Sequence, residues 1–405
     1  MGKQRAGRAT RAHCVVVCEV DHEDPANRLT SERNQFSIAK LSADGDPGPV
    51  PAREPTVGEP RAGSLMLMPY TGYANDGELT LHGRVLRARK STLAEGRTSA
   101  WRNFIALARL MNSAEVPGAT VCAHLRSRDH QAVTDREGYF AFTIPLDRKL
   151  ERDVEIDLRL LAPAAGDGVP IVARAMICVP PVSARFGVIS DIDDTIVWTH
   201  VGNRRRMLWT LARSNAGTRK PLAGVAALYR ALYEGVEGDE GNPIFYVSSS
   251  PWNLYPPLVD FLRINGIPRG PIFLRDWGRH MLHDWRDHAT HKLASIRGIM
   301  TTFAHLPFVL VGDSAEQDPE IYRQVVREFP RRVAAIYIHS VSASVARCAE
   351  ITNIAEEVRA LDSSLLLVPD SEKAAINEAR AGRIGNDRIE HVLLDERVEK
   401  QLPAS

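Results

Sequence analysis

The sequence has few cysteines, no excess of either charge and no long hydrophobic run. Its five cysteines are an odd number spread through 405 residues, which argues against a disulfide framework and favours a reducing, cytoplasmic location. Fifty-one Lys and Arg residues face 50 Asp and Glu residues, so the net charge gives no reason to expect a nucleic-acid partner. No segment approaches the roughly 20 apolar residues that a membrane-spanning helix needs, so we expect no transmembrane span.

Length and composition predict a folded chain of more than one domain. At about 100 to 200 residues per domain, 405 residues correspond to two or three domains. Hydrophobic residues make up 44% and charged residues 25% of the chain, which excludes a wholly disordered protein. Residues 1–63 combine a short N-terminal strand with a lead-in rich in Pro, Gly and charged residues, as is typical of a linker.

Residues 64–183 contain short apolar segments separated by clusters of Gly, Asp, Asn and Pro. This pattern predicts an all-β sandwich domain. The segments are LMLMPY, ELTLHGRVL, ATVCAHL, YFAFTI and VEIDLRLL. The stretch AVTDREGYFAFTIP resembles the prealbumin-like sandwich modules attached to many enzymes, so we expect a fold of the prealbumin or immunoglobulin type. No pattern of residues assigns this domain a role.

Residues 184–345 change to continuously apolar strands that alternate with helical stretches. Such strands need both faces covered, which predicts an α/β domain with a doubly wound parallel sheet. Its ligand should lie beyond the carboxyl ends of the strands. The strands are FGVIS, PIFYVS, PIFL, PFVLVG and VAAIYIHS. Residues 346–405 predict a C-terminal helical segment and tail.

The first of these strands ends in DIDDT, which contains Asp191 and Asp193. Carboxylates two residues apart can converge on one bound phosphate, while adjacent residues would diverge. One can attack phosphorus and the other can move protons. The sequence therefore predicts phosphate chemistry at this turn.

The second strand runs into Ser248, Ser249 and Ser250, before Pro251. A serine hydroxyl and backbone N–H groups at a strand end can hold phosphoryl oxygens. We predict phosphate binding at Ser248 with Ser249 beside it. Ser250 is predicted to cap a helix, because Pro251 suits a first helical position.

Three further residues complete the candidate site. Lys292 lies between the serine strand and the last acidic strand, where its charge could neutralise an aspartyl-phosphate, although a lone lysine is usually solvated surface. Asp313 ends the apolar strand PFVLVG and suits Mg²⁺, a hard cation that takes oxygen ligands. Asp318 precedes Pro319 and a helical run, which also fits a helix N-cap.

In order, spacing and strand-end placement, these four segments resemble the haloacid dehalogenase superfamily of phosphotransferases. The stretches that carry a narrower resemblance are DIDDTIVWTHV, FYVSSSPWNLYPPLVDFL, HKLASIRGIM and VLVGDSAEQDPEIY. They are similar to the catalytic domain of the actin-patch-associated phosphatidate phosphatases, relatives of the lipins, over about residues 184 to 345. The resemblance implies a Rossmann-like sheet with a minimal cap, and Mg²⁺-dependent hydrolysis of phosphatidate to diacylglycerol and phosphate.

The resemblance also implies a role for each residue. Asp191 would attack phosphorus, and Asp193 would protonate the leaving alkoxide and then activate water. Ser248 and Lys292 would hold the phosphoryl group. The ligands of Mg²⁺ and their support would come from Asp191, Asp313, the backbone carbonyl of Asp193, and Asp318.

Two features fit a substrate held at a surface. Short connections between the motifs leave little room for a lid, and an open cleft suits a lipid head group or a phosphoprotein. The stretch containing Arg204, Arg205 and Arg206 interleaves cations with apolar residues, which fits contact with an anionic membrane as well as a solvated helix. Trp252 beside the serines fits a head-group or acyl contact as well as core packing.

We therefore expect a cytoplasmic enzyme that works at the membrane periphery on phosphatidate or another lipid phosphate. One alternative keeps the mechanism and changes the substrate to a phosphoprotein or another phosphate ester. A second is a noncatalytic phosphatidate-binding module, and the presence of both Asp191 and Asp193 argues against it. The sequence names no protein partner.

Overall fold

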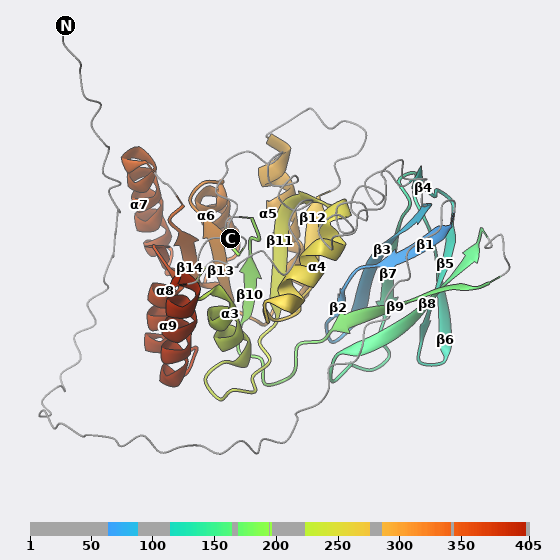
Figure 1. Ribbon diagram of the computed structural model, residues 1–405, viewed down its shortest axis with the longest axis horizontal. Coiled ribbons are helices and arrows are strands. Elements are labelled where there is room, and N and C mark those ends of the chain that lie inside the picture. Colours follow the sequence, from blue (N-terminus) through green and yellow to red (C-terminus); the bar gives the residue numbers. More distant parts are fainter. Residues whose placement is uncertain are drawn as a thin grey trace, which may run out of the picture.

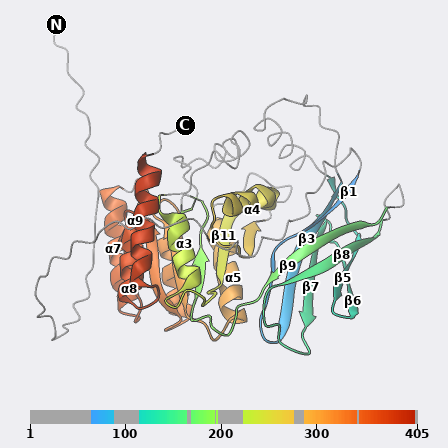
Figure 2. The ribbon, with the colours of Figure 1, turned by 60° about the horizontal axis from the view of Figure 1, so that its bottom comes forward.

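The computed structural model describes residues 64–87, 114–163, 169–193, 195–196, 223–275, 286–341 and 344–401, and two sheets organise them. Figure 1 shows a strand-rich unit built from the earlier part of the chain beside a layered unit of helices and strands. Each sheet has a hydrophobic core of its own. Figure 2 shows from a second direction that helix α4 (Tyr255–Ile264) lies on the side of the layered unit that faces the strand-rich unit.

The strand-rich unit is a mostly antiparallel sheet. Of its nine strands within the described residues, seven run in the order β1-β3-β2-β9-β8-β5-β6, and the other two, β4 and β7, pair with β3. Only the pairing of β2 with β9 is parallel among the pairs described. In β7 and β8 buried and exposed residues alternate, as expected when one face of a sheet covers a core. The strands are β1 (Leu65–Pro69), β2 (Gly72–Ala74), β3 (Glu78–Arg87), β4 (Ala114–Glu115), β5 (Thr120–Leu125), β6 (Arg128–Val133), β7 (Tyr139–Pro145), β8 (Val154–Ala162) and β9 (Ile171–Cys178).

The second unit confirms the predicted α/β fold with a parallel sheet. Six strands of the described chain pair in the order β12-β11-β10-β13-β14-β15, and every pairing is parallel. Residues of β10, β11 and β13 are buried throughout, which explains their unbroken apolar pattern. The strands are β10 (Gly187–Ser190), β11 (Ile244–Pro251), β12 (Ile272–Arg275), β13 (Phe308–Asp313), β14 (Val333–His339) and β15 (Leu365–Val368).

Helices cover both faces of the parallel sheet (Figure 1). Residues of α3, α4, α8 and α9 share one core cluster, and residues of α5, α6 and α7 share the other. The helical elements are α3 (Val225–Glu234), the short 3₁₀ turn η2 (Trp252–Leu254), α4 (Tyr255–Ile264), α5 (Arg286–Thr302), α6 (Asp318–Glu328), α7 (Val345–Arg359), α8 (Ser371–Arg380) and α9 (Asn386–Gln401). None of the helices described combines the length and apolar character that crossing a bilayer requires.

The C-terminal segment contributes more than the helices and tail expected of it. Its strand β15 pairs with β14 from Ile336↔Leu365 to His339↔Val368. The apolar residues LLLV of this strand pack on both core clusters of the α/β unit. The α/β unit therefore extends into the segment that follows residue 345.

The strand order places a switch point between β10 and β13. From β10 the chain moves outward to β11 and β12 on one side, and it later returns to β13 and continues outward on the other. In such sheets a crevice forms outside the carboxyl ends of the two strands that flank the switch point. Asp191 directly follows β10 and Asp313 ends β13, so both lie where a ligand site is expected.

Candidate active site

Asp191 lies at the carboxyl end of β10, at the centre of the parallel sheet. Its backbone N–H donates to the carbonyl of Val311 in β13 at 2.9 Å, and its own carbonyl accepts from the Ser190 hydroxyl at 2.6 Å. The residue is 1% exposed. The backbone that carries this carboxylate is therefore fixed by the sheet.

Lys292 reaches the same place from α5. Its Nζ lies 2.8 Å from Oδ1 of Asp191, 2.5 Å from Oδ1 of Asp318 and 3.3 Å from Oε2 of Glu316. Helix α5 begins at Arg286, so Lys292 lies inside it, and Lys292 is 3% exposed. The solvated-surface interpretation of Lys292 is therefore wrong.

Asp193 is held by the serine segment. Its Oδ2 accepts hydrogen bonds from the hydroxyls of Ser248 at 2.7 Å and Ser250 at 3.0 Å. The backbone N–H of Ser250 donates to Oγ of Ser248 at 2.9 Å. The pairing of β11 with β12 shifts register between Val247 and Pro251, and such an irregularity re-aims side chains at a strand end. Both hydroxyls therefore converge on one carboxylate oxygen.

The prediction that Ser250 caps a helix is wrong. The 3₁₀ turn after it begins at Trp252 without a side-chain cap, and the Ser250 hydroxyl turns toward Asp193 instead. A charged acceptor makes a stronger hydrogen bond than a neutral backbone group. Ser249 is buried at 4% exposure.

Asp313 and Asp318 form the third part of the cluster. Oδ1 of Asp313 accepts from the backbone N–H groups of Ala315 at 2.6 Å and Glu316 at 2.9 Å. Oδ2 of Asp318 accepts from the backbone N–H of Asp313 at 3.1 Å. Asp318 is the first residue of α6, and Gln317 holds the N-cap position without a side-chain bond. Asp318 is therefore not the N-cap of α6, and its carboxylate instead holds Lys292 and the backbone of Asp313.

The carboxylates raise one another's pKa values because they are buried together. Burial raises the pKa of Asp193 to about 6, helped by the charge of Glu316 and opposed by the two serine hydroxyls. Burial and the charge of Asp318 raise the pKa of Asp313 to about 8. Burial also raises the pKa of Asp191 well above its usual range, although Lys292 opposes this.

Lys292 is the cation of this cluster. Burial alone would lower its pKa, but the charges of Asp191, Asp318 and Glu316 hold the pKa well above the usual lysine value. One ammonium group therefore faces several carboxylates within a buried space. This excess of negative charge favours the binding of a further cation.

The donor set fits a hard divalent cation. Asp191, Asp313 and Asp318 each offer a carboxylate oxygen, and these oxygens lie within 4.8 Å of one another. Oδ2 of Asp191 and Oδ2 of Asp313 are buried, and the described part of the chain gives neither a hydrogen-bond donor. Buried carboxylate oxygens without donors are costly unless a cation occupies the space. An all-oxygen set suits Mg²⁺ better than a softer transition metal.

The structure thus brings together Asp191, Asp193, Ser248, Lys292, Asp313 and Asp318. Sequence reasoning missed Glu316 and the part played by Ser250. Glu316 lies between two predicted site residues in GDSAEQD, and this position could have identified it.

Arg204, Arg205 and Arg206 lie outside the described residues. Trp252 is partly buried, and its ring stacks on that of Tyr70 with centroids 4.0 Å apart.

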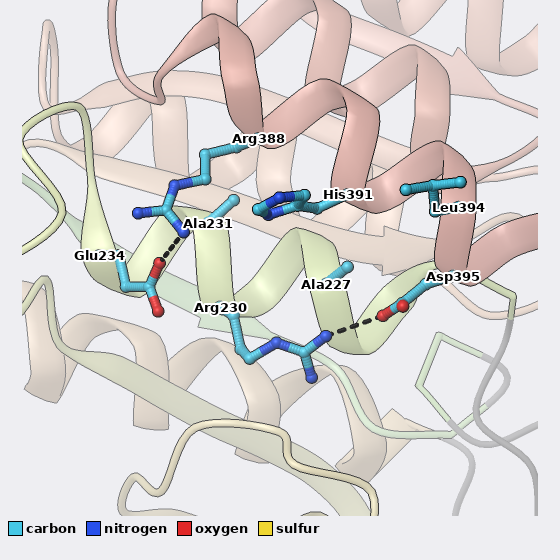
Figure 3. Close-up of a pocket in the computed structure, with 8 residues that line it drawn as sticks. All are labelled: Ala227, Arg230, Ala231, Glu234, Arg388, His391, Leu394 and Asp395. Atoms are coloured by element: carbon cyan, nitrogen blue, oxygen red, sulfur yellow. Dashed lines mark hydrogen bonds and ion pairs between the residues drawn. The ribbon is translucent and has the colours of Figure 1, made fainter. Parts of the chain in front are cut away.

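A separate hollow of about 230 Å³ lies between α3 and α9 (Figure 3). Arg388 spans it to Glu234 at 2.6 Å, and Arg230 spans it to Asp395 at 2.7 Å. Its cations are therefore already paired with carboxylates. None of the residues that line it belongs to the acidic cluster.

Comparison with known proteins agrees with the site. Residues 186–340 match the family model for the catalytic domain of phosphatidate phosphatase APP1. A stretch of 161 residues is 35% identical to phosphatidate phosphatase APP1 of Saccharomyces cerevisiae (strain ATCC 204508 / S288c), covering 40% of this chain and 27% of that protein. A stretch of 218 residues is 28% identical to the uncharacterized protein C29B5.04c of Schizosaccharomyces pombe (strain 972 / ATCC 24843), covering 53% of this chain and 35% of that protein.

The chain spans 27% and 35% of the lengths of the two fungal proteins. The matches therefore cover only a part of each of those proteins. Among solved structures, the carbohydrate acetylesterase XAC1771 from Xanthomonas citri is 12% identical, with 71% of this chain and 72% of that chain covered and a TM-score of 0.24. A likeness this low supports no argument about fold or function. The resemblance carried by the four motifs is confirmed, because residues 186–340 match the family of APP1-type phosphatidate phosphatase catalytic domains.

Proposed function

We propose that this chain is a Mg²⁺-dependent phosphatase of the haloacid dehalogenase type that hydrolyses phosphatidate to diacylglycerol and phosphate. One observation carries the proposal. Asp191 presents a carboxylate at the switch point of the sheet beside Lys292, while Asp193, two residues on, is held separately by two serines. Two neighbouring carboxylates in different surroundings can take the roles of nucleophile and acid–base catalyst.

In the first half-reaction, a carboxylate oxygen of Asp191 attacks phosphorus and forms an acyl phosphate. The bond between phosphorus and the glycerol oxygen breaks, and the electron pair leaves with that oxygen. Asp193 gives its proton to the leaving oxygen, which departs as the hydroxyl of diacylglycerol. The raised pKa of Asp193, about 6, supports this role because the carboxyl group can carry a proton near neutral pH.

In the second half-reaction, water attacks the phosphorus of the aspartyl-phosphate. Asp193, now ionised, takes a proton from that water. The bond between phosphorus and the Asp191 oxygen breaks, which releases inorganic phosphate and restores the carboxylate. Each residue returns to its starting state.

Lys292 and the serine segment hold the transferred group. The Nζ of Lys292 lies close enough to Asp191 to pair with phosphoryl oxygens bonded there. When substrate is bound, the Ser248 hydroxyl, which donates to Asp193 in the structure, would turn its proton to a phosphoryl oxygen, and the backbone beside Ser249 would offer further donors. When bound by Asp191, Asp313 and the carbonyl of Asp193, Mg²⁺ supplies positive charge for the phosphoryl oxygens. Asp318 keeps Lys292 and the backbone of Asp313 in place.

We propose further that the enzyme is cytoplasmic and acts at the membrane periphery. The matched family supports a lipid phosphate as substrate. The cations Arg204, Arg205 and Arg206 follow the catalytic turn in the sequence and offer partners for anionic head groups. A phosphoprotein or a soluble phosphate ester is the alternative substrate for the same mechanism.

We also propose that residues 64–183 form a β-sandwich of the prealbumin or immunoglobulin kind. The alternating burial of its strands around one core supports this. Residues 184–345 would then hold the catalytic residues of an α/β unit that β15, α8 and α9 complete, and residues 1–63 would be a lead-in.

A phosphate-release assay tests the proposed function. The purified chain is incubated with phosphatidate in mixed micelles, and in parallel with a phosphopeptide and p-nitrophenyl phosphate, each with Mg²⁺ or with EDTA. We expect EDTA-sensitive release that is fastest from phosphatidate. Phosphate release from the phosphopeptide alone would indicate that the same mechanism acts on a phosphoprotein. No release from any of the three would contradict a catalytic role.

A further inference from the structure

The strand-rich unit contacts the chain segment that carries the phosphate-binding serines. The ring of Tyr70, which follows β1, stacks on the ring of Trp252 with centroids 4.0 Å apart and an angle of 14°. It also meets the ring of Tyr255, with centroids 4.6 Å apart. Tyr70 is 3% exposed and belongs to the core cluster of the α/β unit rather than to that of its own sheet. It is therefore an anchor between the two units.

Hydrogen bonds join the same two segments. The backbone N–H of Thr71 donates to Oη of Tyr255 at 2.6 Å, and Oγ1 of Thr71 lies 2.9 Å from the same oxygen. Tyr255 begins α4, seven positions after Ser248. The start of α4 is thus fixed by the strand-rich unit.

Arg84 of β3 makes a second link. Its Nε donates to the carbonyl of Glu137 at 2.9 Å, and its guanidinium lies over the Tyr139 ring at 4.4 Å. Its Nη1 then donates to Oδ1 of Asn253 at 3.2 Å. Arg84 is 9% exposed, so this cation is held rigidly by its own unit while it binds the neighbouring one.

The serines lie at the end of β11, directly before Trp252 and Asn253. The ladder of β11 and β12 pairs Val247 with Phe273 and next pairs Pro251 with Arg275, with an irregular register between them. Regular pairing with β12 therefore does not fix the positions of Ser248 and Ser250. Trp252 and Asn253 follow immediately, so whatever holds them also limits where the serine hydroxyls can lie.

We propose that Tyr70 and Arg84 are positioning residues for the active site. By holding Trp252 and Asn253, they fix the hydroxyls of Ser248 and Ser250, and through these the carboxylate of Asp193. This inference rests on the proposed function. It makes the strand-rich unit a part of the catalytic machinery, because the unit determines the geometry of proton transfer as well as the stability of the fold.

The test uses the full chain with Arg84→Met and Tyr70→Leu. We expect kcat on phosphatidate to fall about 10- to 100-fold, with KM changed less than about threefold, because a small displacement of a catalytic group acts mainly on the transition state. Tyr70→Phe keeps the stacked ring and should keep at least about half of the wild-type kcat. Asn253→Ala removes the same link from the other side, and its effect should not add to that of Arg84→Met.

The matched controls are Asn75→Ala and Tyr73→Leu. They lie in the same interface, but Asn75 donates to the carbonyl of Thr302 at 3.2 Å and Tyr73 meets the rings of Phe245, Phe273 and Phe303. They should lower the midpoint of thermal unfolding and leave kcat within about twofold of wild type. Equal losses of kcat in controls and test variants would overturn the proposal, and so would folded test variants with wild-type kcat.

Binding of inorganic phosphate in the presence of Mg²⁺, measured by calorimetry, separates this inference from the proposed function. If the wild-type chain releases no phosphate from any ester, the proposed function fails. The positioning role is then measured by phosphate affinity, which should fall about two- to threefold in Arg84→Met and Asn253→Ala and stay unchanged in Asn75→Ala. Unchanged affinity in all three would contradict the inference by itself.

Discussion

Gly312 has no side chain, and the carboxylate of Asp318 occupies the space that a side chain at this position would fill. A Cβ atom at position 312 would lie 2.4 Å from Oδ2 of Asp318 and 2.8 Å from its Cβ. The same carboxylate accepts from the backbone N–H of Asp313 and pairs with Lys292. The absence of a side chain at one position of β13 thus allows three site residues to meet.

Gly312→Ala is therefore expected to displace Asp318. Overpacking of a buried site costs about 1 to 3 kcal/mol, and Lys292 would lose its shortest contact, so both the unfolding midpoint and kcat should fall. Gly298→Ala in α5 is the control, because nothing lies within 4 Å of the added Cβ. It should stabilise the chain by about 0.5 to 1 kcal/mol. Wild-type activity in Gly312→Ala would show that the contact between Asp318 and Lys292 is dispensable.

Asp191→Asn is expected to abolish turnover without unfolding the chain. An amide cannot form the acyl phosphate, and loss of a nucleophile costs on the order of 10⁴-fold or more in kcat. Because burial raises the pKa of Asp191, a neutral amide should not lower the unfolding midpoint measured in EDTA. Phosphate release and thermal unfolding are the two measurements. Turnover near wild type would assign the attack to another residue.

Asp193→Asn should slow both half-reactions, with an effect that depends on the leaving group. With phosphatidate, the loss of one proton-transfer group should cost about 10²- to 10⁴-fold. p-Nitrophenolate needs no protonation to leave, so the variant should give a burst of about one nitrophenolate per active site followed by slow turnover. Stopped-flow absorbance detects the burst. Equal slowing of both substrates without a burst would remove Asp193 from the acid role.

Binding of Mg²⁺ should stabilise the chain through Asp313. A ligand that binds only the folded state stabilises it by about 2.7 kcal/mol at 100 times its dissociation constant, so the unfolding midpoint should rise with Mg²⁺ concentration. In Asp313→Asn this dependence should be lost. The metal-free variant should be at least as stable as wild type, because burial and Asp318 raise the pKa of the native carboxyl group to about 8. An unchanged Mg²⁺ response in the variant would exclude Asp313 as a ligand.

His339 should make stability depend on pH in mildly acidic solution. Burial lowers the pKa of His339 to about 4, with Asp370 opposing the shift. Below the unfolded value of about 6.5 the unfolded chain binds the proton more tightly, so stability is complete above pH 6.5 and falls as the pH drops toward 4. From pH 7.5 to 5 this single group should cost about 2 kcal/mol.

Urea unfolding of His339→Gln at both pH values measures this contribution. The variant should lose about 2 kcal/mol less than wild type on acidification, because glutamine does not titrate. The comparison with wild type cancels the titration of the other acidic groups. Parallel losses in both proteins would show that His339 does not titrate as proposed.

The sequence alone predicted the α/β fold class and most residues of the candidate site. Unbroken apolar strands indicated a parallel sheet because a strand buried on both faces excludes polar residues. Asp191, Ser248 and Asp313 were identified because each follows or ends such a strand, where the sheet must leave an open edge. These signals are local in the chain, so one sequence is enough to read them.

Only the tertiary structure decided the roles that depend on contacts between distant segments. Periodicity could not distinguish Lys292 from a surface lysine, and burial against Asp191 and Asp318 settled its position. Ser250 looked like a helix cap until Asp193, 57 positions away, proved to be its acceptor. The link from Arg84 to Asn253 spans 169 positions and has no sequence pattern of its own. A pairing between segments is set by how whole sheets and helices pack, which no single stretch of sequence encodes.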